Sequence, residues 1–222
     1  MSQTFPVLRA FLFDLDGTLI DSKVDLVNSV NAMLRQMGRA ELPTELVATY
    51  IGHGAPQLIA SALGPDATDE QRRTGLSLFL AHYQWHKLDA TRPYPGVVEV
   101  LDALAGYPMS VLTNKPTNMS VDILQGLGLA KYFRSIYGGD SFEKKKPDPA
   151  GALKILQELG VPPAQAAMVG DSEVDVQTAR NAGMVAVTVN YGFGVHDRAA
   201  HPADIYLDSL TDLVSLTRNH RP

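Results

Sequence analysis

The sequence contains no cysteine in its 222 residues. This absence excludes disulfide scaffolds, cysteine-rich zinc modules, thiolate-ligated iron–sulfur clusters and every mechanism with a cysteine nucleophile. Long apolar runs are also missing: no segment approaches the roughly 20 apolar residues that span a bilayer. Near the N-terminus, Arg9 and Asp14 interrupt the apolar stretch, which is atypical of a secretory signal. We therefore expect no membrane segment and a cytoplasmic location.

An excess of basic residues is absent as well, because the formal net charge is -5. This balance disfavours broad electrostatic binding to nucleic acid or to anionic membranes, so we expect neither as a partner. A small anionic substrate stays compatible with it, since a local basic pocket can lie within an acidic protein. The hydrophobic fraction of 45% is typical of a globular chain with a substantial core. The sequence leaves a monomer and a homodimer equally open.

Short apolar runs alternate with helical patterns through most of the chain. The runs lie at residues 7–13, 109–112, 166–169 and 184–189, with weaker ones at 135–137 and 205–207. Apolar residues at helical spacing fill residues 96–104, 116–127, 149–159 and 173–182. Alternation of this kind predicts an α/β fold, with a parallel sheet that carries helices on both faces.

Several residues mark the expected ends of helices. Asp148 followed by Pro149 is typical of an N-cap and a first helical position. Gly160 and Gly183 suit helix C-termini. In the segment before residue 89, Thr68 and the glutamine at position 71 have the spacing of a capping box.

Residues 21–88 break the alternation. This stretch lacks strand-like runs, and its pattern predicts helices near residues 24–37, 44–50, 55–63 and 69–88. An all-helical segment inserted after the first strand of an α/β sheet indicates a second, smaller domain. We therefore expect a helical cap at residues 21–88, and a core made of residues 1–20 and 89–222.

The string Asp-Leu-Asp-Gly-Thr follows the first predicted strand directly, at residues 14–18. Residues two apart in an extended chain point to the same side, so Asp14 and Asp16 would project together from the strand's carboxyl end. Open α/β sheets bind ligands at that end, and Gly17 would let the backbone pass close to a bound group. Two neighbouring carboxylates repel, which predicts a cation or a shared proton. A plain turn with capping aspartates is the alternative interpretation.

A second acidic string, Gly-Asp-Ser-Glu-Val-Asp, occupies residues 170–175 between an apolar run and a helix. Asp171 alone could be an ordinary N-cap. Together with Asp14 and Asp16 at neighbouring strand ends, it becomes a candidate third carboxylate. Hard oxygen ligands of this kind suit Mg²⁺, which is commonly completed by substrate phosphate. Asp175 would lie one helical turn further on, so we place it in the outer shell of the metal.

Two weaker strings follow other strands. Thr113 and Asn114 put a hydroxyl and an amide at a strand end, just before a helix whose free N–H groups favour anions. The run Lys-Lys-Lys-Pro at residues 144–147 supplies cations before another helix, although an isolated basic run is usually a solvated loop. Both strings become stronger candidates for substrate binding because they follow predicted strands, as the acidic strings do.

The strings DLDGT, TNK, KKKP and GDSEVD, in this order and spacing, resemble the haloacid dehalogenase superfamily over the whole chain. The resemblance implies a Rossmann-like core with an inserted helical cap, and phosphoryl transfer through an aspartyl-phosphate. It makes Asp14 the expected nucleophile and Asp16 the general acid and base. Thr113 would hold the phosphate, and Lys146 would neutralise its charge and that of the nucleophile. Asp171 would bind Mg²⁺ together with a carboxylate oxygen of Asp14 and the backbone carbonyl of Asp16.

The remaining loop residues divide into two groups. We expect Gly17, Thr18 and Asn114 to contribute to phosphate or substrate binding. Lys144 and Lys145 would be bystanders beside the proline-linked lysine. The resulting prediction is a Mg²⁺-dependent phosphomonoester hydrolase that acts on a small phosphorylated metabolite.

Further strings narrow the resemblance to bacterial phosphoglycolate phosphatases. They include FDLDGTLIDS, YIGHGA, VLTNKPT, YGGD and KKKPDP. Within the expected cap, Gly52, His53 and Gly54 could offer N–H groups and an imidazole to the carboxylate of the substrate. The alternative interpretation of these three residues is a simple turn between helices.

Three other functions stay open at this point. Phosphatases of sugar phosphates or pyrophosphate share many of these strings. A phosphomutase similar to β-phosphoglucomutase would use the same catalytic residues, if the closed cap kept water from the phosphorylated aspartate. A noncatalytic, phosphate-binding regulatory protein could keep the fold, although such proteins usually lack one or more catalytic groups.

Overall fold

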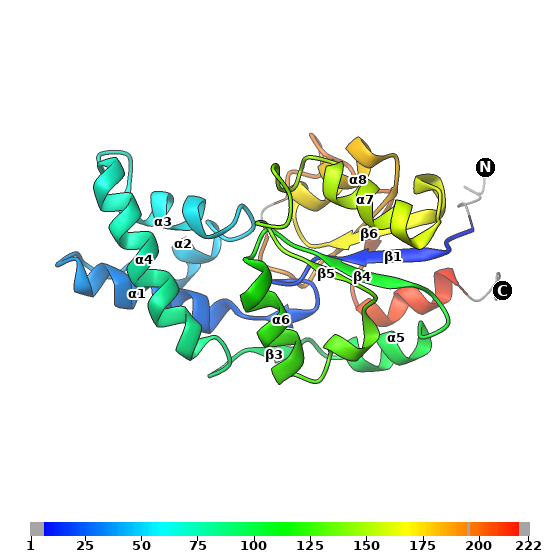
Figure 1. The fold of residues 1–222 in the computed structure, drawn as a ribbon, viewed down its shortest axis with the longest axis horizontal. Coiled ribbons are helices and arrows are strands. Elements are labelled where there is room, and N and C mark those ends of the chain that lie inside the picture. The colour runs from blue at the N-terminus through cyan, green and yellow to red at the C-terminus, as the bar shows by residue number, and fades with distance from the viewer. Residues whose placement is uncertain (1–6, 195, 218–222) are drawn as a thin grey trace.

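A six-stranded parallel sheet forms the centre of the computed structural model, which describes residues 7–194 and 196–217. Its spatial order is β5-β4-β1-β6-β7-β8, so the first strand lies in the middle (Figure 1). The strands are β1 (Ala10–Phe13), β4 (Met109–Leu112), β5 (Ile136–Tyr137), β6 (Ala166–Gly170), β7 (Val185–Val189) and β8 (Ile205–Leu207). The predicted parallel α/β sheet is confirmed.

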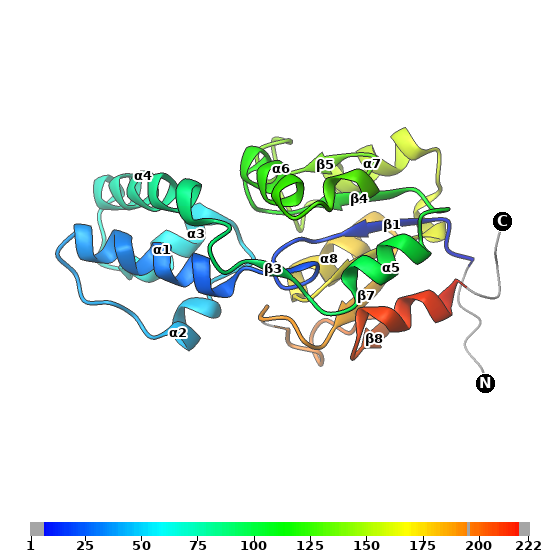
Figure 2. The ribbon, with the colours of Figure 1, turned by 90° about the horizontal axis from the view of Figure 1, so that it is seen from below.

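Helices cover both faces of this sheet (Figures 1 and 2). One face carries α5 (Val97–Ala103), α6 (Thr117–Gly126) and the 3₁₀ helix η3 (Leu210–Leu216). The other face carries α7 (Ala150–Leu159) and α8 (Glu173–Ala182). Alternate residues of β1 serve the two faces: Phe11 and Phe13 pack in the first apolar core, and Leu12 packs in the second. The sheet is therefore buried on both sides, as its apolar strands require.

Four helices, here called the cap helices, lie beyond one end of the sheet (Figure 1). They are α1 (Lys23–Gln36), α2 (Thr44–Ala48), α3 (Ala55–Leu63) and α4 (Asp69–His86). The two chain segments that join them to the core pair as short antiparallel strands, β2 (Ile20–Asp21) and β3 (Arg92–Pro93). Asp25 on α1 also stabilises this connection. Its carboxylate accepts hydrogen bonds from the backbone N–H groups of Ala90 and Thr91 at 2.8–3.0 Å.

The capping signals of the sequence are largely confirmed. The Thr68 hydroxyl accepts a hydrogen bond from the Gln71 backbone N–H, and the Gln71 side chain accepts one from the Thr68 N–H. Gly160 and Gly183 end α7 and α8 in the left-handed conformation, at φ 67° and 72°. The helices begin and end within two residues of the predicted positions. The remaining short elements are the 3₁₀ helices η1 (Ala130–Tyr132) and η2 (Pro163–Gln165).

Two local predictions are wrong. The first strand begins at Ala10 rather than at residue 7, because Val7 and Arg9 are exposed and do not enter the sheet. The helix expected to begin at Pro149 begins at Ala150, and Pro149 is its N-cap residue. Pro149 has no N–H to donate, and the Asp148 carboxylate instead accepts a hydrogen bond from the N–H of Ala150, which is the first residue of the helix.

Strand register sets the position of the candidate site. Phe13 of β1 pairs with Val111 of β4 and with Val169 of β6, so the three strands reach the same edge of the sheet. From β1 the chain runs outward through β4 and β5, and it then crosses to β6, β7 and β8 on the other side of β1. The direction of strand order therefore reverses beside β1, which is the switch point at which open α/β sheets bind ligands. Among the helices described, none is both long and apolar enough to cross a membrane.

Candidate active site

Asp14 occupies the first position after β1, at the sheet edge that faces the cap helices. Its backbone N–H donates to the Val169 carbonyl at 2.9 Å, which continues the ladder with β6 and fixes the direction of the side chain. The loop after β6 brings Asp171 to the same edge, and the loop after β4 brings Thr113 and Asn114. The structure therefore gathers the strand-end residues that the sequence singled out.

A buried lysine joins two carboxylates at this edge. The Lys146 ammonium donates to Asp14 Oδ1 at 2.8 Å and to Asp175 Oδ1 at 2.6 Å. All three residues are at most 7% exposed. The other oxygen of Asp175 accepts hydrogen bonds from the Ser172 backbone N–H at 3.2 Å and from its hydroxyl at 2.7 Å. Asp175 thus caps α8 and orients the lysine at the same time.

Burial and charge shift the pKa values of this group in opposite directions. Burial raises the pKa of Asp14 to about 6, although the Lys146 ammonium opposes this increase. Burial alone would lower the pKa of Lys146, but the negative charges of Asp14 and Asp175 raise it above its ordinary value. The lysine therefore stays charged at neutral pH, and Asp14 ionises with its help.

Three buried carboxylates lie close enough to share a cation. Oxygen atoms of Asp14, Asp171 and Asp175 lie within 4.8 Å of one another. Asp171 Oδ2 accepts hydrogen bonds from the N–H groups of Phe193 and Gly194 at 3.0 and 2.7 Å. Even so, burial and the charges of Asp175 and Asp14 raise the pKa of Asp171 well above its ordinary value. One lysine does not balance three carboxylates, so the donor set fits a divalent metal ion.

Glycines let the backbone close around Asp171. A Cβ atom at Gly17 would lie 2.0 Å from Asp171 Oδ2, and Gly17 itself has a φ of +86°. A Cβ atom at Gly192 would lie 2.2 Å from the Asp171 Cβ. A side chain at either position would therefore displace the carboxylate, which explains why glycine is required there.

The carboxylate of Asp16 points away from the metal candidates and toward the cap. It accepts a hydrogen bond from the Ser22 hydroxyl at 2.5 Å and two from the Lys115 ammonium, at 2.9 and 3.0 Å. Lys115 also donates to the Tyr83 hydroxyl on α4 at 2.7 Å. In the sequence, Lys115 was part of the TNK string without a role of its own, and Tyr83 was not singled out. No feature of the sequence near either residue predicts this contact.

Three predicted phosphate-binding residues lie in the loops after β1 and β4, and two of them, Thr113 and Asn114, line a cavity together with Asp14. Thr18 is fully buried, and its hydroxyl has no hydrogen-bond partner among the residues that the structure describes. The same is true of the Asn114 side-chain oxygen. The Thr113 hydroxyl accepts one hydrogen bond, from the Lys115 N–H at 3.3 Å. Buried polar groups without partners are uncommon in native proteins, so the Asn114 oxygen, which belongs to a residue that lines the cavity with Asp14, is available to a ligand.

The loop of Gly52, His53 and Gly54 in the cap lies against the core. The Asn114 side-chain amide donates to the Gly52 carbonyl at 3.0 Å, and the Lys145 ammonium donates to the His53 carbonyl at 2.7 Å. Lys145, expected to be a bystander, therefore joins the cap loop to the core. The exposed His53 side chain lines a neighbouring groove along residues 143–149, whereas Gly52 and Gly54 face Asp14.

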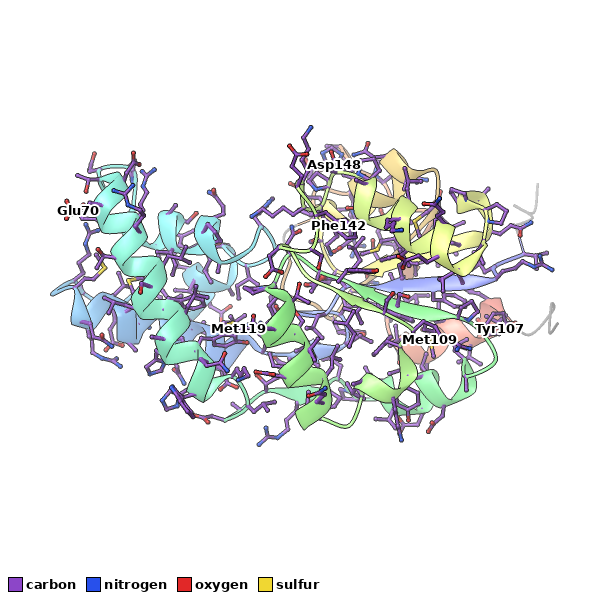
Figure 3. The ribbon with its side chains drawn as sticks, in the orientation of Figure 1. Glu70, Tyr107, Met109, Met119, Phe142 and Asp148 are labelled. Atoms are coloured by element: carbon purple, nitrogen blue, oxygen red, sulfur yellow. The ribbon has the colours of Figure 1, made fainter. Side chains whose placement is uncertain are left out.

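A cavity between the cap helices and the sheet edge joins these groups. Its empty space is about 510 Å³, including the part open to solvent. Asp14, Asp16, Thr113 and Asn114 form its polar floor. The opposite wall is mostly apolar and includes Met119, which Figure 3 shows on the side of α6 nearest the cap helices. A ligand in this cavity would have its polar end at the floor near Asp14 and its other end against the apolar wall.

This geometry is suited to transfer of a charged group to a carboxylate. Asp14 is a buried carboxylate held by a lysine, and it shares the cavity with a second carboxylate, Asp16, that can exchange protons. Lys146 and a cation at the acidic group would supply the positive charge that a phosphoryl group requires.

Comparison with known proteins agrees with this geometry. Residues 11–189 match the family described as haloacid dehalogenase-like hydrolase. The chain is 40% identical to a phosphoglycolate phosphatase of Pseudomonas savastanoi pv. phaseolicola, over 93% of this chain and 78% of that protein. It is 37% identical to a phosphoglycolate phosphatase of Chromobacterium violaceum, over 96% of this chain and 97% of that protein.

A solved structure shows the same arrangement of elements. The crystal structure of a predicted phosphoglycolate phosphatase from Haemophilus somnus has a TM-score of 0.88 and 31% sequence identity, and the match covers 95% of this chain and 98% of that one. The family match spans more than half of the chain and includes the strand-end loops of the site. The chain therefore belongs to the haloacid dehalogenase-like hydrolases.

Proposed function

We propose that this hydrolase is a Mg²⁺-dependent phosphatase that converts 2-phosphoglycolate into glycolate and phosphate. The observation that carries the proposal is the buried pair of Asp14 and Lys146, placed beside Asp16 in a small cavity. The names of the relatives at 37–40% identity support the choice of substrate. We further propose a cytoplasmic location, a core of residues 1–20 and 89–222, and a cap of residues 21–88.

In the first step, a carboxylate oxygen of Asp14 attacks the phosphorus atom, and the bond from phosphorus to the ester oxygen breaks. Asp16 donates a proton to the departing oxygen, so that glycolate leaves as the alcohol and Asp14 carries the phosphoryl group. Lys146 and the N–H groups and hydroxyls near Thr113 and Thr18 hold the phosphoryl oxygens. The lysine also keeps Asp14 ionised before the attack.

In the second step, water attacks the phosphorus atom of the aspartyl-phosphate. Asp16, which has lost its proton, accepts one from this water, and the bond between phosphorus and Asp14 breaks. Phosphate leaves, and both aspartates regain their initial states. The cap loop at Gly52 and Gly54 covers the substrate in both steps.

Asp14, Asp171 and the backbone carbonyl of Asp16 would hold Mg²⁺, with Asp175 behind them. The ion would supply positive charge to the phosphoryl oxygens in the transition state. The buried carboxylates and the raised pKa of Asp171, caused by burial and neighbouring charge, support a cation at this position.

A panel of substrates tests the proposed function. We expect phosphate release from 2-phosphoglycolate with a higher kcat/KM than from hexose phosphates, β-glucose 1-phosphate or pyrophosphate, and loss of that release in EDTA. Mg²⁺-dependent activity that favours another ester would support the proposed reaction and contradict the proposed substrate. Absence of release from every compound would favour a phosphomutase or a noncatalytic phosphate-binding protein.

The two glycines that flank α3 allow a matched test of the cap loop. Gly54 precedes the helix at φ 86° and ψ 165°, and Gly64 follows it at φ 81° and ψ 172°, so both occupy a region that is nearly restricted to glycine. A Cβ atom at Gly54 would lie 2.9 Å from the Asn114 carbonyl oxygen, whereas one at Gly64 would meet nothing within 4 Å. Gly54→Ala should therefore raise KM about 10-fold, because backbone strain and the clash, together worth about 1–3 kcal/mol, hold the loop off the core.

Gly64→Ala is the control for backbone strain alone. We expect it to lower the free energy of unfolding by about 1–3 kcal/mol and to leave KM for 2-phosphoglycolate within about twofold of the wild-type value. Steady-state kinetics and urea unfolding of both variants provide the comparison. An equal change of KM in the two variants would show that Gly54 has no special contact with the core.

A further inference from the structure

Lys115 is a buried cation whose contacts the proposed mechanism does not use. It lies in the loop between β4 and α6, is 5% exposed, and reaches across to Tyr83 on the cap helix α4. Among the cavity-lining residues that the structure describes, Lys115 is the only cationic one. Lys146 holds Asp14 from outside this lining, so the two lysines serve different parts of the space.

Tyr83 offers a hydrogen-bond donor into the same cavity. Its hydroxyl oxygen accepts from Lys115 at 2.7 Å, and no described residue accepts the proton that the hydroxyl itself carries. Tyr83 is 1% exposed, and burial raises the pKa of its hydroxyl to about 12, so this proton stays in place at neutral pH. A buried donor without an acceptor, next to an ammonium ion, is suited to an anionic oxygen.

The position of Asp16 defines where that anionic oxygen would belong. As general acid, Asp16 must lie about 3 Å from the oxygen that leaves the phosphorus atom. The Lys115 ammonium lies 2.9 Å from an oxygen of Asp16, in the cavity that Asp14 and Tyr83 also line. In 2-phosphoglycolate one methylene separates the leaving oxygen from the carboxylate. A substrate of this length would therefore bring its carboxylate beside Lys115 and Tyr83.

The rest of the cavity wall opposite Asp14 offers the substrate carboxylate no other charged partner. Leu26, Ile51, Leu58, Phe79 and Met119 are apolar, and a buried carboxylate next to them would lack compensation. His53, the residue that the sequence suggested for this role, lines the neighbouring groove instead.

We propose that Lys115 and Tyr83 bind the carboxylate of the substrate, and that they determine the preference for a phosphate ester with an α-carboxylate. This inference rests on the proposed function. One donor comes from the core and the other from the cap, so a bound carboxylate would also join the two parts. Substrate recognition and cap closure would then depend on the same pair.

Ethyl phosphate is the matched probe, because it carries a methyl group where 2-phosphoglycolate carries the carboxylate. The test compares kcat/KM for the two esters in the wild type, Lys115→Met and Tyr83→Phe, all with Mg²⁺. We expect Lys115→Met to lower the preference for 2-phosphoglycolate over ethyl phosphate by about 10²-fold, and Tyr83→Phe by about 10-fold. Loss of the lysine's contact with Asp16 would affect both esters equally, so it cancels in this ratio.

Tyr83→Phe keeps the ring that stacks on Phe79 with a centroid separation of 5.6 Å, so this variant tests the proposal even if Lys115→Met does not fold. Lys154→Met, on the exposed surface of α7, is the control for the lysine substitution and should leave the ratio unchanged.

Equal losses for both esters in Lys115→Met and Tyr83→Phe would show that the pair only positions Asp16, and the proposal would be wrong. The proposal would also fail if His53→Ala removed the preference while the other two variants kept it. A wild-type enzyme that releases no phosphate from 2-phosphoglycolate would instead reject the proposed function, together with the inference that rests on it.

Discussion

Asp14→Asn should lower the rate of phosphate release from 2-phosphoglycolate on the order of 10⁴-fold or more, because an amide cannot attack phosphorus. The side chain keeps its size, and Lys146 keeps its second partner, Asp175. The measurement is kcat with saturating Mg²⁺, in freshly purified protein and alongside Asp14→Ala to exclude recovery of aspartate by deamidation. The control is Asp102→Asn, at an exposed aspartate on α5 whose carboxylate accepts a hydrogen bond from the Tyr132 hydroxyl, and it should not affect kcat.

The same substitution is expected to stabilise the protein without metal. Burial raises the pKa of Asp14 from 3.8 to about 6, so the folded state binds this proton more tightly than the unfolded chain does. Ionisation of Asp14 therefore lowers the free energy of unfolding as the pH rises from about 4 to above 6. Asparagine does not titrate, so in EDTA at pH 7 the variant should exceed the wild type by up to about 3 kcal/mol.

Urea unfolding as a function of pH separates these two effects. The stability difference should shrink toward pH 4 and disappear below it, because Asp14 is already protonated in the folded state and becomes protonated in the unfolded chain as the pH falls below 3.8. Loss of activity together with a gain in stability would assign Asp14 to chemistry rather than to folding. A variant that retains more than a trace of activity would contradict its assignment as the nucleophile.

The sequence located the acidic part of the site because each acidic string directly follows an apolar run, and this order is visible within a short segment. Asp14 and Asp171 each follow a fully buried strand, and parallel pairing brings both strand ends to one edge. The two-residue spacing of Asp14 and Asp16 predicted a shared direction. In the structure, however, Asp16 turns toward Lys115, while Asp175 lies with Asp14 and Asp171.

The remaining contacts depend on how the cap sits on the core, which the pattern of one segment does not encode. Tyr83 and Lys115 are 32 residues apart and belong to different parts of the fold. On α4, Tyr83 has the spacing of an ordinary apolar position, next to Phe79. The resemblance singled out Lys146, which reaches Asp14 in the structure, but it gave Lys145 no role, and the contact of Lys145 with the His53 carbonyl depends on the position of the cap loop.

Lys146→Met should impair both catalysis and folding. Removal of the lysine takes away the donor that faces Asp14 and the transferred phosphoryl group, so kcat should fall by about 10²–10³-fold. It also leaves Asp14 and Asp175 buried without their shared cation, and loss of one partner from a buried ion pair costs about 3–5 kcal/mol. The measurements are kcat with Mg²⁺ and urea unfolding in EDTA at pH 7.

Lys154→Met provides the matched control. Lys154 pairs with Glu158 at 3.3 Å on the surface of α7, where its side chain is 51% exposed. Exposed pairs of this kind contribute about 0–1 kcal/mol, so this variant should resemble the wild type in both measurements. Similar losses of stability in the two variants would contradict the structural role that the buried contacts give to Lys146.

A second substitution distinguishes charge compensation from catalysis. Asp175→Asn in the Lys146→Met background removes one of the two uncompensated carboxylates and keeps an amide near Ser172. Since stability depends on the net buried charge, the double variant should recover part of the lost free energy of unfolding. Catalysis depends on a cation next to Asp14, which the double variant still lacks, so kcat should stay as low as in Lys146→Met. Recovery of both quantities would mean that Lys146 acts only by balancing Asp175, and that the phosphoryl group needs no charge from it.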